Sequence, residues 1–365
     1  MFLRWHSAAP LLALALGAGQ GAAQPTPRRD VRWCAGGDVT LGTNLDTSWV
    51  LGRTDSGGRV RALPDAETLL QPLQPLVRDA TVILVNVEGA IGEGWAPRKC
   101  APRSTLCFAL RQPPAVAAAI RRLSDSARVV GNVANNHAHD AGDGGFAKTV
   151  RTLEAAGIVV AGADTLAAAV PVGEGDTIAV LGFSPWSIGR VSDLAAVRRH
   201  VARAAERYGR VVVTMHIGAE GAGARHVSDR TERYAGEDRG NSVAFARAAV
   251  GSGASLVVGH GPHVLRAIEW NGDALVAHSL GNLVTYGPFH HQEFTDRGVV
   301  LCVTLAGDGR VRDAVLRATR QRSPGIVEPD PDNAGVNDII ALTSRDFPRT
   351  GARILPNGEV GPPRP

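Results

Sequence analysis

The hydrophobic pattern of this chain changes partway along it. In the earlier part, short continuous apolar runs alternate with segments whose apolar residues recur at helical spacing. Such runs, each followed by a helix, are typical of parallel strands that are buried on both faces. The predicted strands cover 32–39, 81–87, 129–134, 158–161, 177–184, 210–216 and 255–258. The predicted helices cover 65–79, 113–123, 146–156, 193–208 and 241–250.

The later part has the pattern of antiparallel hairpins. Two apolar segments, 265–270 and 275–278, flank Asn271-Gly272, a dipeptide that favours a tight hairpin turn. A second hairpin is predicted from the segments 299–305 and 311–316. Together with the earlier pattern, this predicts an α/β fold with mixed sheets, flanking helices and late antiparallel hairpins.

The length of the chain and the composition of its C-terminal segment indicate the domain organisation. The 365 residues suffice for one large α/β domain or two modest ones. The segment 321–365 is rich in Pro, Asp and Asn and has no sustained period. It is therefore predicted to be an irregular tail, with much loop or disorder.

The N-terminal segment has the features of a secretory signal. Arg4 lies in a short basic region, an apolar run covers 11–16, and small residues precede Gln24. This predicts a signal peptide over residues 1–23. The run is too short to span a bilayer and no second such run follows. The mature protein is therefore expected to be secreted or periplasmic and to have no transmembrane span.

Export makes the four cysteines informative. Cys100 and Cys107 lie close together in a polar loop that contains a proline, so they are predicted to form a disulfide in an oxidising compartment. Cys34 and Cys302 lie within apolar, strand-like runs. They are predicted to be buried, unreactive core thiols.

The charge balance restricts the class of partner. The net charge is +4, from 39 basic and 35 acidic residues. So small an excess predicts no nucleic-acid partner. It is compatible with an acidic polymer as substrate, although a solvated surface of mixed sign accounts for it more simply.

Ligand chemistry is densest in the stretch 129–145, VVGNVANNHAHDAGDGG. An apolar strand leads there into Asn135, Asn136 and His137, and a helical pattern follows. Open α/β sheets place their sites at such strand ends. Taken alone, the cluster would more often satisfy the backbone of its own loop than bind a ligand.

Other strand ends carry matching side chains, and this favours a metal site. The residues are Asp38, Asn86, Glu88, His216, His260 and His263, with Glu220 shortly after His216 and Asn282 after the first hairpin. Mixed carboxylate, carboxamide and imidazole ligands suit Mn, Fe or Zn better than Ca. A pair of metal ions needs a bridging carboxylate, for which Glu88 is the candidate. Individually, Asp38 could cap a turn and Asn86, Asn282 and Glu220 could brace loops or face solvent.

Other catalytic classes lack their motifs. The chain has no GxSxG nucleophile elbow, and Ser279 follows a hairpin rather than a strand that turns into a helix. Neither a P-loop nor a GxGxxG after the first strand is present, which argues against nucleotide cofactors.

Six ordered blocks give the chain a family resemblance. They are GDVTLG from Gly37, NVEGAI from Asn86, ANNHAHDAG from Ala134, HIGAE from His216, GHGPHVLRAIE from Gly259 and SLGN from Ser279. They resemble the CapA-like family of poly-γ-glutamate capsule biosynthesis, which is similar to a branch of the calcineurin-like metallophosphoesterase superfamily. Over residues 31–320 the resemblance implies an α/β sandwich that holds metals at its strand ends.

The resemblance also implies roles for individual residues. Asp38 and His263 would bind one metal ion, and Glu88 would bridge to a second. Asn136, His216 and His260 would bind that second ion. His137 would be the catalytic general acid that protonates a leaving oxygen.

The chain departs from the phosphoesterase pattern at three places. Thr40 stands where a histidine is usual, Asn86 and Glu88 replace the usual GDxxD block, and His260 and His263 are three residues apart rather than two. The residues expected to support the ligands or to contact substrate are Asn86, Asn135, Glu220 and Asn282.

The expected function is metal-dependent hydrolysis in the cell envelope. One or two divalent ions would serve to cleave amide or phosphoester bonds during synthesis of an anionic polymer such as poly-γ-glutamate, with a membrane complex for synthesis or export as a further partner. One alternative is a non-catalytic envelope protein whose degenerate site binds polymer or assists its export. Another is a broad exported phosphoesterase that cleaves simple aryl phosphates with Mn.

Overall fold

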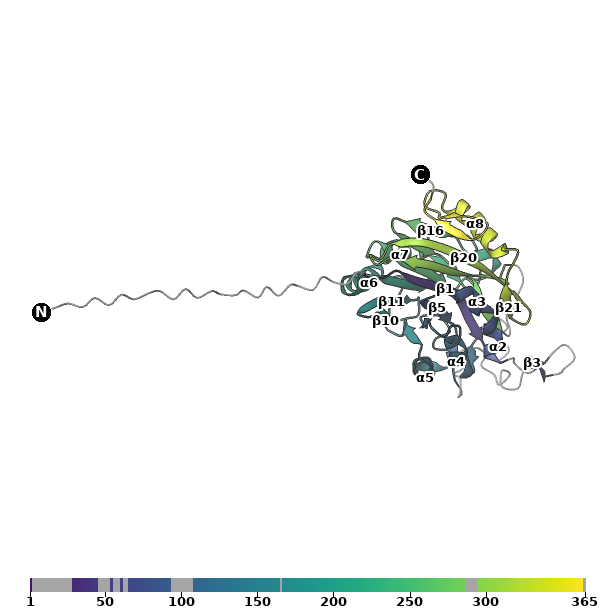
Figure 1. Cartoon of the computed structure of the whole chain (residues 1–365). Helices are drawn as coiled ribbons and strands as arrows, with labels where there is room; N and C mark the ends of the chain where they lie inside the picture. The colour runs from purple at the N-terminus through teal and green to yellow at the C-terminus, as the bar shows by residue number, and fades with distance from the viewer. Residues whose placement is uncertain are drawn as a thin grey trace.

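Two large β-sheets lie face to face, with helices on their outer sides (Figure 1). This computed structural model describes residues 1, 28–44, 53–54, 60–61, 65–92, 108–164, 166–286 and 294–363. Among these residues, no helix combines the length and the apolar character needed to cross a membrane. The predicted signal peptide and the predicted Cys100–Cys107 disulfide lie outside the described residues.

The larger sheet has ten strands and is parallel on one side of β1 and antiparallel on the other. Strands β1, β5, β8 and β9 run parallel, whereas β19 and β20 return antiparallel. In spatial order the strands are β22 (Arg353–Ile354), β23 (Glu359–Gly361), β20 (Val311–Arg322), β19 (Arg297–Leu305), β1 (Val31–Leu41), β5 (Val82–Val87), β8 (Arg128–Asn132) and β9 (Val159–Ala161), with β18 (Asn282–Tyr286) beside β1 and β21 (Ile326–Pro329) beside β20.

The smaller sheet has six strands, of which the central four are parallel. Its order is β10 (Ala168–Gly173), β11 (Asp176–Phe183), β12 (Val211–His216), β15 (Leu256–His260), β17 (Ala274–Ala277) and β16 (Ile268–Asn271). Short strands form three minor sheets: β2 (Thr43–Asn44) with β7 (Leu110–Gln112) and β6 (Ala90–Ile91), β3 (Arg53–Thr54) with β4 (Val60–Arg61), and β13 (Glu232–Tyr234) with β14 (Glu237–Gly240).

Three apolar clusters give the molecule four layers. Alternate residues of a strand point to opposite faces, so in β1 Trp33 packs between the sheets while Cys34 packs toward the helices. The helices over the larger sheet are α2 (Ala66–Leu70), η1 (Gln71–Leu73), α3 (Gln74–Val77), α4 (Ala115–Arg121) and α5 (Gly142–Ala155). Those over the smaller sheet are α6 (Leu194–Tyr208) and α7 (Ser242–Val250).

The predicted α/β sandwich with mixed sheets is confirmed, and so are both hairpins. The first hairpin is β16 with β17, and the second is β19 with β20. All seven apolar runs of the earlier part form strands, at 31–41, 82–87, 128–132, 159–161, 176–183, 211–216 and 256–260.

The prediction of free core thiols at Cys34 and Cys302 is wrong, because the two residues form a disulfide. Both side chains are buried, as predicted. However, Cys34 is the direct partner of Cys302 in the antiparallel pair β1 and β19. The two residues are 268 apart in sequence, so only the pairing of the strands reveals that they meet.

The prediction of an irregular tail over 321–365 is also wrong. Strand β21 pairs with β20, β23 pairs with β20, and β22 pairs with β23. Helix α8 (Ala334–Asp346) buries Val336 and Ile339 against the core between the sheets. The three strands have only two to four residues each, which is too short for an alternating apolar period to be recognised in the sequence.

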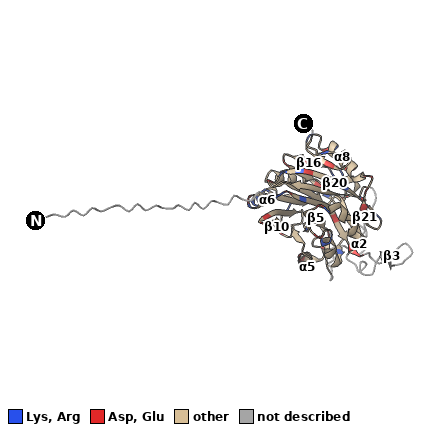
Figure 2. Ribbon diagram, viewed as in Figure 1, with Lys and Arg blue, Asp and Glu red and all other residues tan. Residues whose placement is uncertain are grey.

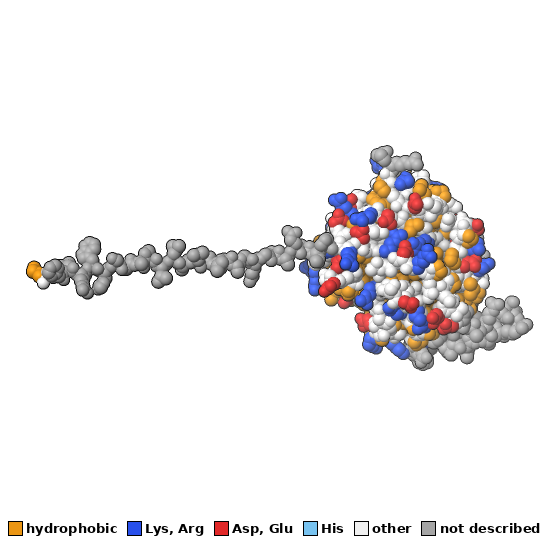
Figure 3. Space-filling view, in the orientation of Figure 1, with side chains coloured by type: hydrophobic (Ala, Val, Ile, Leu, Met, Phe, Trp, Pro, Cys, Tyr) orange, Lys and Arg blue, Asp and Glu red, His pale blue; other side chains and the backbone are white. Residues whose placement is uncertain are grey.

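Charged side chains of both signs are scattered over the sheets and helices (Figure 2). On the face that Figure 3 shows, basic and acidic side chains are interspersed. On β20, for example, Arg317 forms an ion pair with Asp79 and Arg320 with Glu328. This face therefore has the mixed-sign surface that the sequence predicts.

Candidate metal centre

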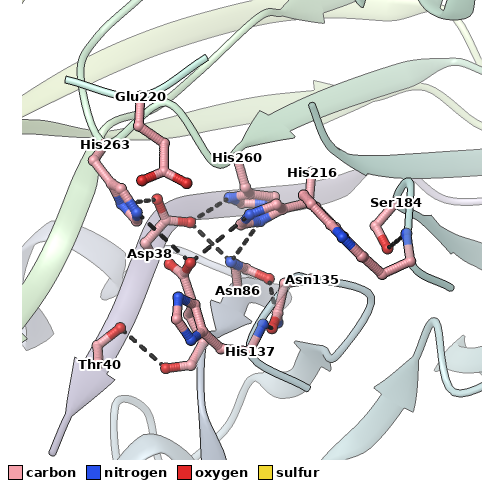
Figure 4. A network of polar contacts seen from close by, with 12 residues as sticks. Asp38, Thr40, Asn86, Asn135, His137, Ser184, His216, Glu220, His260 and His263 are labelled. Carbon is pink, nitrogen blue, oxygen red and sulfur yellow. Dashed lines mark hydrogen bonds and ion pairs between the residues drawn. The ribbon is translucent and has the colours of Figure 1, made fainter. Parts of the chain in front are cut away.

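The carboxyl ends of strands from both sheets meet at one place. In the larger sheet Asp38 of β1 is paired in register with Asn86 of β5, and in the smaller sheet His216 of β12 is paired with His260 of β15. The two pairs face each other across the sandwich (Figure 4). Parallel strands align their carboxyl ends along one edge, which is why residues so distant in sequence converge.

Two buried carboxylates lie at this place. Asp38 and Glu88 have no solvent-exposed surface. The Asp38 Oδ1 atom accepts a hydrogen bond from Asn86 Nδ2 at 2.8 Å, whereas neither carboxylate oxygen of Glu88 has a hydrogen-bond partner. Glu88 Oε1 lies 3.7 Å from His216 Nε2 and 3.6 Å from His263 Nε2. Glu88 therefore lies between His216 and His263, which the resemblance assigns to different metal ions. This is the position of a bridging ligand.

Two histidines have ring nitrogens without partners. His260 is fully buried and neither of its ring nitrogens has a hydrogen-bond partner, although Nδ1 lies 3.7 Å from Asp38 Oδ1. The buried His216 likewise leaves Nε2 without a partner. Gly261, at φ 107°, lies so close that a Cβ atom there would be 3.0 Å from the His216 ring. Leaving a buried polar atom unsatisfied costs about 1–3 kcal/mol.

His263 is held by contacts on two sides. Its Nδ1 lies 3.0 Å from Asp38 Oδ2 and 3.0 Å from Asn282 Oδ1. The amide of Asn282 also donates to the carbonyl oxygens of His263 at 3.3 Å and Thr295 at 3.0 Å. The backbone of His263 has φ 57°, the left-handed region. Such strain persists only where surrounding contacts fix it, and it is concentrated at functional sites.

A chain of side-chain amides supports the carboxylates. Asn86 donates to Asp38, and its Oδ1 accepts from Asn132 Nδ2 at 2.8 Å and Asn135 Nδ2 at 3.3 Å. Asn135 Nδ2 also donates to the backbone oxygen of Val87 at 2.9 Å. The Asn86 amide therefore presents its nitrogen to the centre and acts as a support for Asp38.

The turn after β8 places a histidine and an aspartate together. His137 Nδ1 lies 2.5 Å from Asp140 Oδ2, and both residues are buried. Asp140 Oδ2 also accepts from the backbone nitrogen of Leu110 at 2.6 Å. The carboxylate fixes the ring orientation and directs the other nitrogen, Nε2, away from Asp140. Asn136 lies in the same turn and is partly exposed.

Glu220 lies above Asp38 and His263 (Figure 4). Its Oε1 accepts from Arg239 Nη1 at 2.6 Å. The preceding residue, Ala219, donates its backbone nitrogen to Glu232 Oε2 at 3.0 Å, and Arg266 in turn binds Glu232 through both terminal nitrogens at 2.8 Å. Two buried arginines thus hold Glu220 toward the centre.

The surroundings shift the pKa values of these groups strongly. Burial raises the pKa of Glu88 well above its usual range, lowers that of His216 well below it, and lowers that of His260 to about 4. Burial opposes the charged form of His263, but the carboxylates of Glu88 and Asp38 outweigh it and raise the pKa of His263. Burial also opposes ionisation of Asp38, yet the contact with His263 lowers the pKa of Asp38 below its usual value.

These residues fit a divalent metal ion. Asp38, Glu88 and His263 each offer a ligand atom, and these atoms all lie within 4.8 Å of one another. The unpartnered atoms of Glu88, His216 and His260 are oxygen and nitrogen donors. A cation would satisfy them and offset the burial of two carboxylates, since buried charge is otherwise costly. Oxygen and imidazole ligands suit Mn, Fe or Zn.

The structure brings together most of the residues proposed from the sequence. They are Asp38, Asn86, Glu88, Asn135, His137, His216, Glu220, His260, His263 and Asn282, and Asn136 lies in the turn between Asn135 and His137. Sequence reasoning missed Asp140 and Arg239. The spacing HAHD, which puts a carboxylate three residues after His137, could have indicated Asp140. Nothing in the local sequence singles out Arg239.

Metal binding is expected to strengthen as pH rises. Glu88 and His263 have raised pKa values, so both bind protons that a metal ion must displace. Each displaced proton makes the affinity for Mn about tenfold tighter per pH unit. Calorimetric titration of Mn in buffers of different ionisation enthalpy counts these protons, and Glu88→Gln should release fewer. An affinity that does not change between about pH 6 and 8 would contradict this account.

Fold and site together define an α/β sandwich with a candidate metal centre at its strand ends. The chain belongs to the family described as bacterial capsule synthesis protein PGA_cap, whose model matches residues 32–286. No curated protein matches the chain. Among solved structures, the crystal structure of a 5'-nucleotidase precursor from Thermus thermophilus is similar, with a TM-score of 0.38 and 15% identity. The match covers 79% of this chain and 54% of that one, so it spans about half of that protein.

Proposed function

We propose that this protein is an exported, metal-dependent hydrolase of the cell envelope. It acts on amide or phosphoester bonds during the synthesis of an anionic polymer such as poly-γ-glutamate. One observation carries the proposal: Glu88, His216 and His260 converge at the strand ends, and each has buried side-chain atoms that make no hydrogen bond. Membership of a capsule synthesis family supplies the biological setting.

Each residue has a separate task in this mechanism. Asp38, Glu88 and His263 would hold one divalent ion, and His216, His260 and Asn136 would hold a second, with Glu88 available to both. Such an ion would supply Lewis acidity to the scissile group. His137 donates a proton to the leaving atom, and Asp140, 2.5 Å from its Nδ1, keeps the ring in the required orientation.

Export is supported by two features of the chain. The N-terminal residues have the signal-peptide pattern. The disulfide between Cys34 and Cys302 is of the kind that persists in oxidising compartments. The proposed partners are the polymer and a membrane complex that makes or exports it.

Metal content tests the proposal. Elemental mass spectrometry on the purified mature protein, reconstituted with Mn, Fe or Zn, should find one or two ions per chain. Glu88→Ala and His216→Ala should each lose most of this metal, because each variant removes a ligand from a buried site. His200→Ala, on α6 over the outer face of the smaller sheet, is the matched control and should retain it. A metal-free wild type after reconstitution would overturn the proposal.

One observation favours a non-catalytic role instead. The Thr40 hydroxyl, at the position where a histidine is usual, donates to the backbone oxygen of Glu88 at 3.1 Å and is therefore engaged in bracing β1. The ligand set of Asp38, Glu88 and His263 therefore has one imidazole fewer than the phosphoesterase pattern. In this role the protein would bind poly-γ-glutamate or assist its export. It would then show no turnover of γ-glutamyl amides, and none of aryl phosphates in the presence of Mn.

A further inference from the structure

A small cavity of about 100 Å³ lies beside the metal centre. Its walls come from the turn after β8, the start of α5, the loop after β9 and the loop that follows β11. Two residues of its lining, Asn135 and Trp186, also contact the centre: Asn135 donates to Asn86, and the Trp186 ring lies 6.2 Å from the His216 ring, edge to face. Asn135 and Trp186 therefore border both the cavity and the centre.

Trp186 and its loop are held in place. The Arg239 guanidinium lies over the Trp186 ring at 4.7 Å. The backbone nitrogens of Trp186 and Ser187 both donate to the Ser184 hydroxyl, at 3.2 and 2.9 Å, and this closes the loop into a tight turn. Because Arg239 also binds Glu220, the same arginine fixes the cavity wall and a carboxylate of the centre.

The lining suits an apolar group. Its lining includes the apolar residues Phe146, Ala163, Trp186 and Ile188, and none of the described residues that line it is Asp, Glu, Lys or Arg. The Asn135 amide is already engaged with Asn86 and Val87, and His139 pairs with Asp143. A charged group would find no ionic partner in this lining and would lose hydration on entering it.

The volume limits the size of the occupant. A cavity of about 100 Å³ holds about three groups of the size of a water molecule, at ~30 Å³ each. Whole ligands occupy about 300 Å³ or more. The cavity therefore has room for one side group of a substrate.

We propose that this cavity is a subsite that accepts a short apolar group, of about three or four carbons, attached to the substrate's scissile group. The inference rests on the proposed hydrolase chemistry and not on the polymer named there, because a glutamate side group ends in a carboxylate that this lining does not pair. It makes Trp186 and Ile188 determinants of specificity. Ile188 supports it independently, because this isoleucine is 75% exposed at the rim of the cavity. An occupant would cover part of that apolar surface.

Binding of alkylphosphonates to the Mn-loaded protein tests the subsite. The phosphonate provides the group for the metal centre, and the alkyl chain probes the cavity from methyl to hexyl. Each buried methylene should tighten the Kd measured by calorimetry about fourfold. The gain should continue to propyl or butyl and then level off, as the cavity is filled.

Two variants locate the effect. Ala163→Leu fills the cavity and should remove the dependence on chain length, whereas Ile188→Ser removes one wall and should reduce it. Leu166→Ser is the matched control, since Leu166 is 72% exposed nearby but does not line the cavity. Methylphosphonate should bind equally to all four proteins, because none of these residues is a proposed metal ligand.

Each outcome decides the question. If methylphosphonate and butylphosphonate bind the wild type equally, the subsite is refuted while the metal centre stands. If chain length still matters equally in Ala163→Leu and Ile188→Ser, the alkyl group binds elsewhere and the subsite is again refuted. If no phosphonate binds the Mn-loaded protein, the subsite and the proposed centre fail together.

Discussion

Replacing His137 by glutamine should lower turnover about 10²–10⁴-fold, the usual contribution of a positioned general acid, and should leave the metal content unchanged. His137 is not among the proposed metal ligands, and its Nδ1 contacts Asp140, so its loss does not remove a proposed ligand. The loss should be greatest for substrates with poor leaving groups, such as alkyl phosphoesters or γ-glutamyl amides. Aryl phosphates need less help from an acid and should be affected less.

The measurement is kcat for the two kinds of leaving group, beside metal analysis of the same preparations. His226→Gln is the matched control, because this histidine is half-exposed, pairs with Asp346, and lines neither the centre nor the cavity beside it. Asp140→Asn should act through His137, with a smaller loss of kcat and a shifted alkaline limb of the pH profile, because activity is lost as pH rises and the acid loses its proton. Equal losses for both leaving groups in His137→Gln would exclude a role as general acid.

Replacing Cys34 and Cys302 together by alanine is expected to lower the free energy of unfolding by about 4 kcal/mol, toward the upper end of the usual range of 2–5 kcal/mol. The bond closes a loop of 268 residues, and long loops lose most chain entropy when they are cross-linked. Both side chains are fully buried, so the variant also loses some packing.

Denaturant unfolding with and without reductant separates the two contributions. Reductant should destabilise the wild type once the bond opens, but should not affect the double variant. Val303→Ala, at a fully buried neighbouring position in β19, should be destabilised without any response to reductant. Equal stability of wild type and double variant under oxidising conditions would show that the bond contributes nothing.

Local patterns in the sequence were sufficient to predict the parallel strands, the late hairpins and most of the candidate site, whereas the sandwich came from the family resemblance. A buried parallel strand has a continuous apolar sequence, so 211–216 was recognisable as a strand and His216 as its carboxyl end. Parallel strands bring such ends together, so His216 and His260 could be expected to be neighbours before their register was known.

Contacts between distant segments were not predictable in this way. Cys34 and Cys302 look like ordinary core residues because their pairing depends on which strands become neighbours. Arg239 lies in a charged, glycine-rich loop, and its stacking on Trp186 and its bond to Glu220 arise only in the folded chain. The segment after 321 lacks a long period because its strands are short and complete the edge of a sheet formed by earlier residues.

The origin of the ligands in both sheets has a consequence for maturation. The proposed ligands extend along the chain from Asp38 to His263, and the centre exists only where the two sheets meet. An unfolded chain has no such centre, so on the proposed function metal uptake would follow the closure of the sandwich. The ion that the protein acquires would then be set by the compartment in which the chain folds, and not by the one in which it is synthesised.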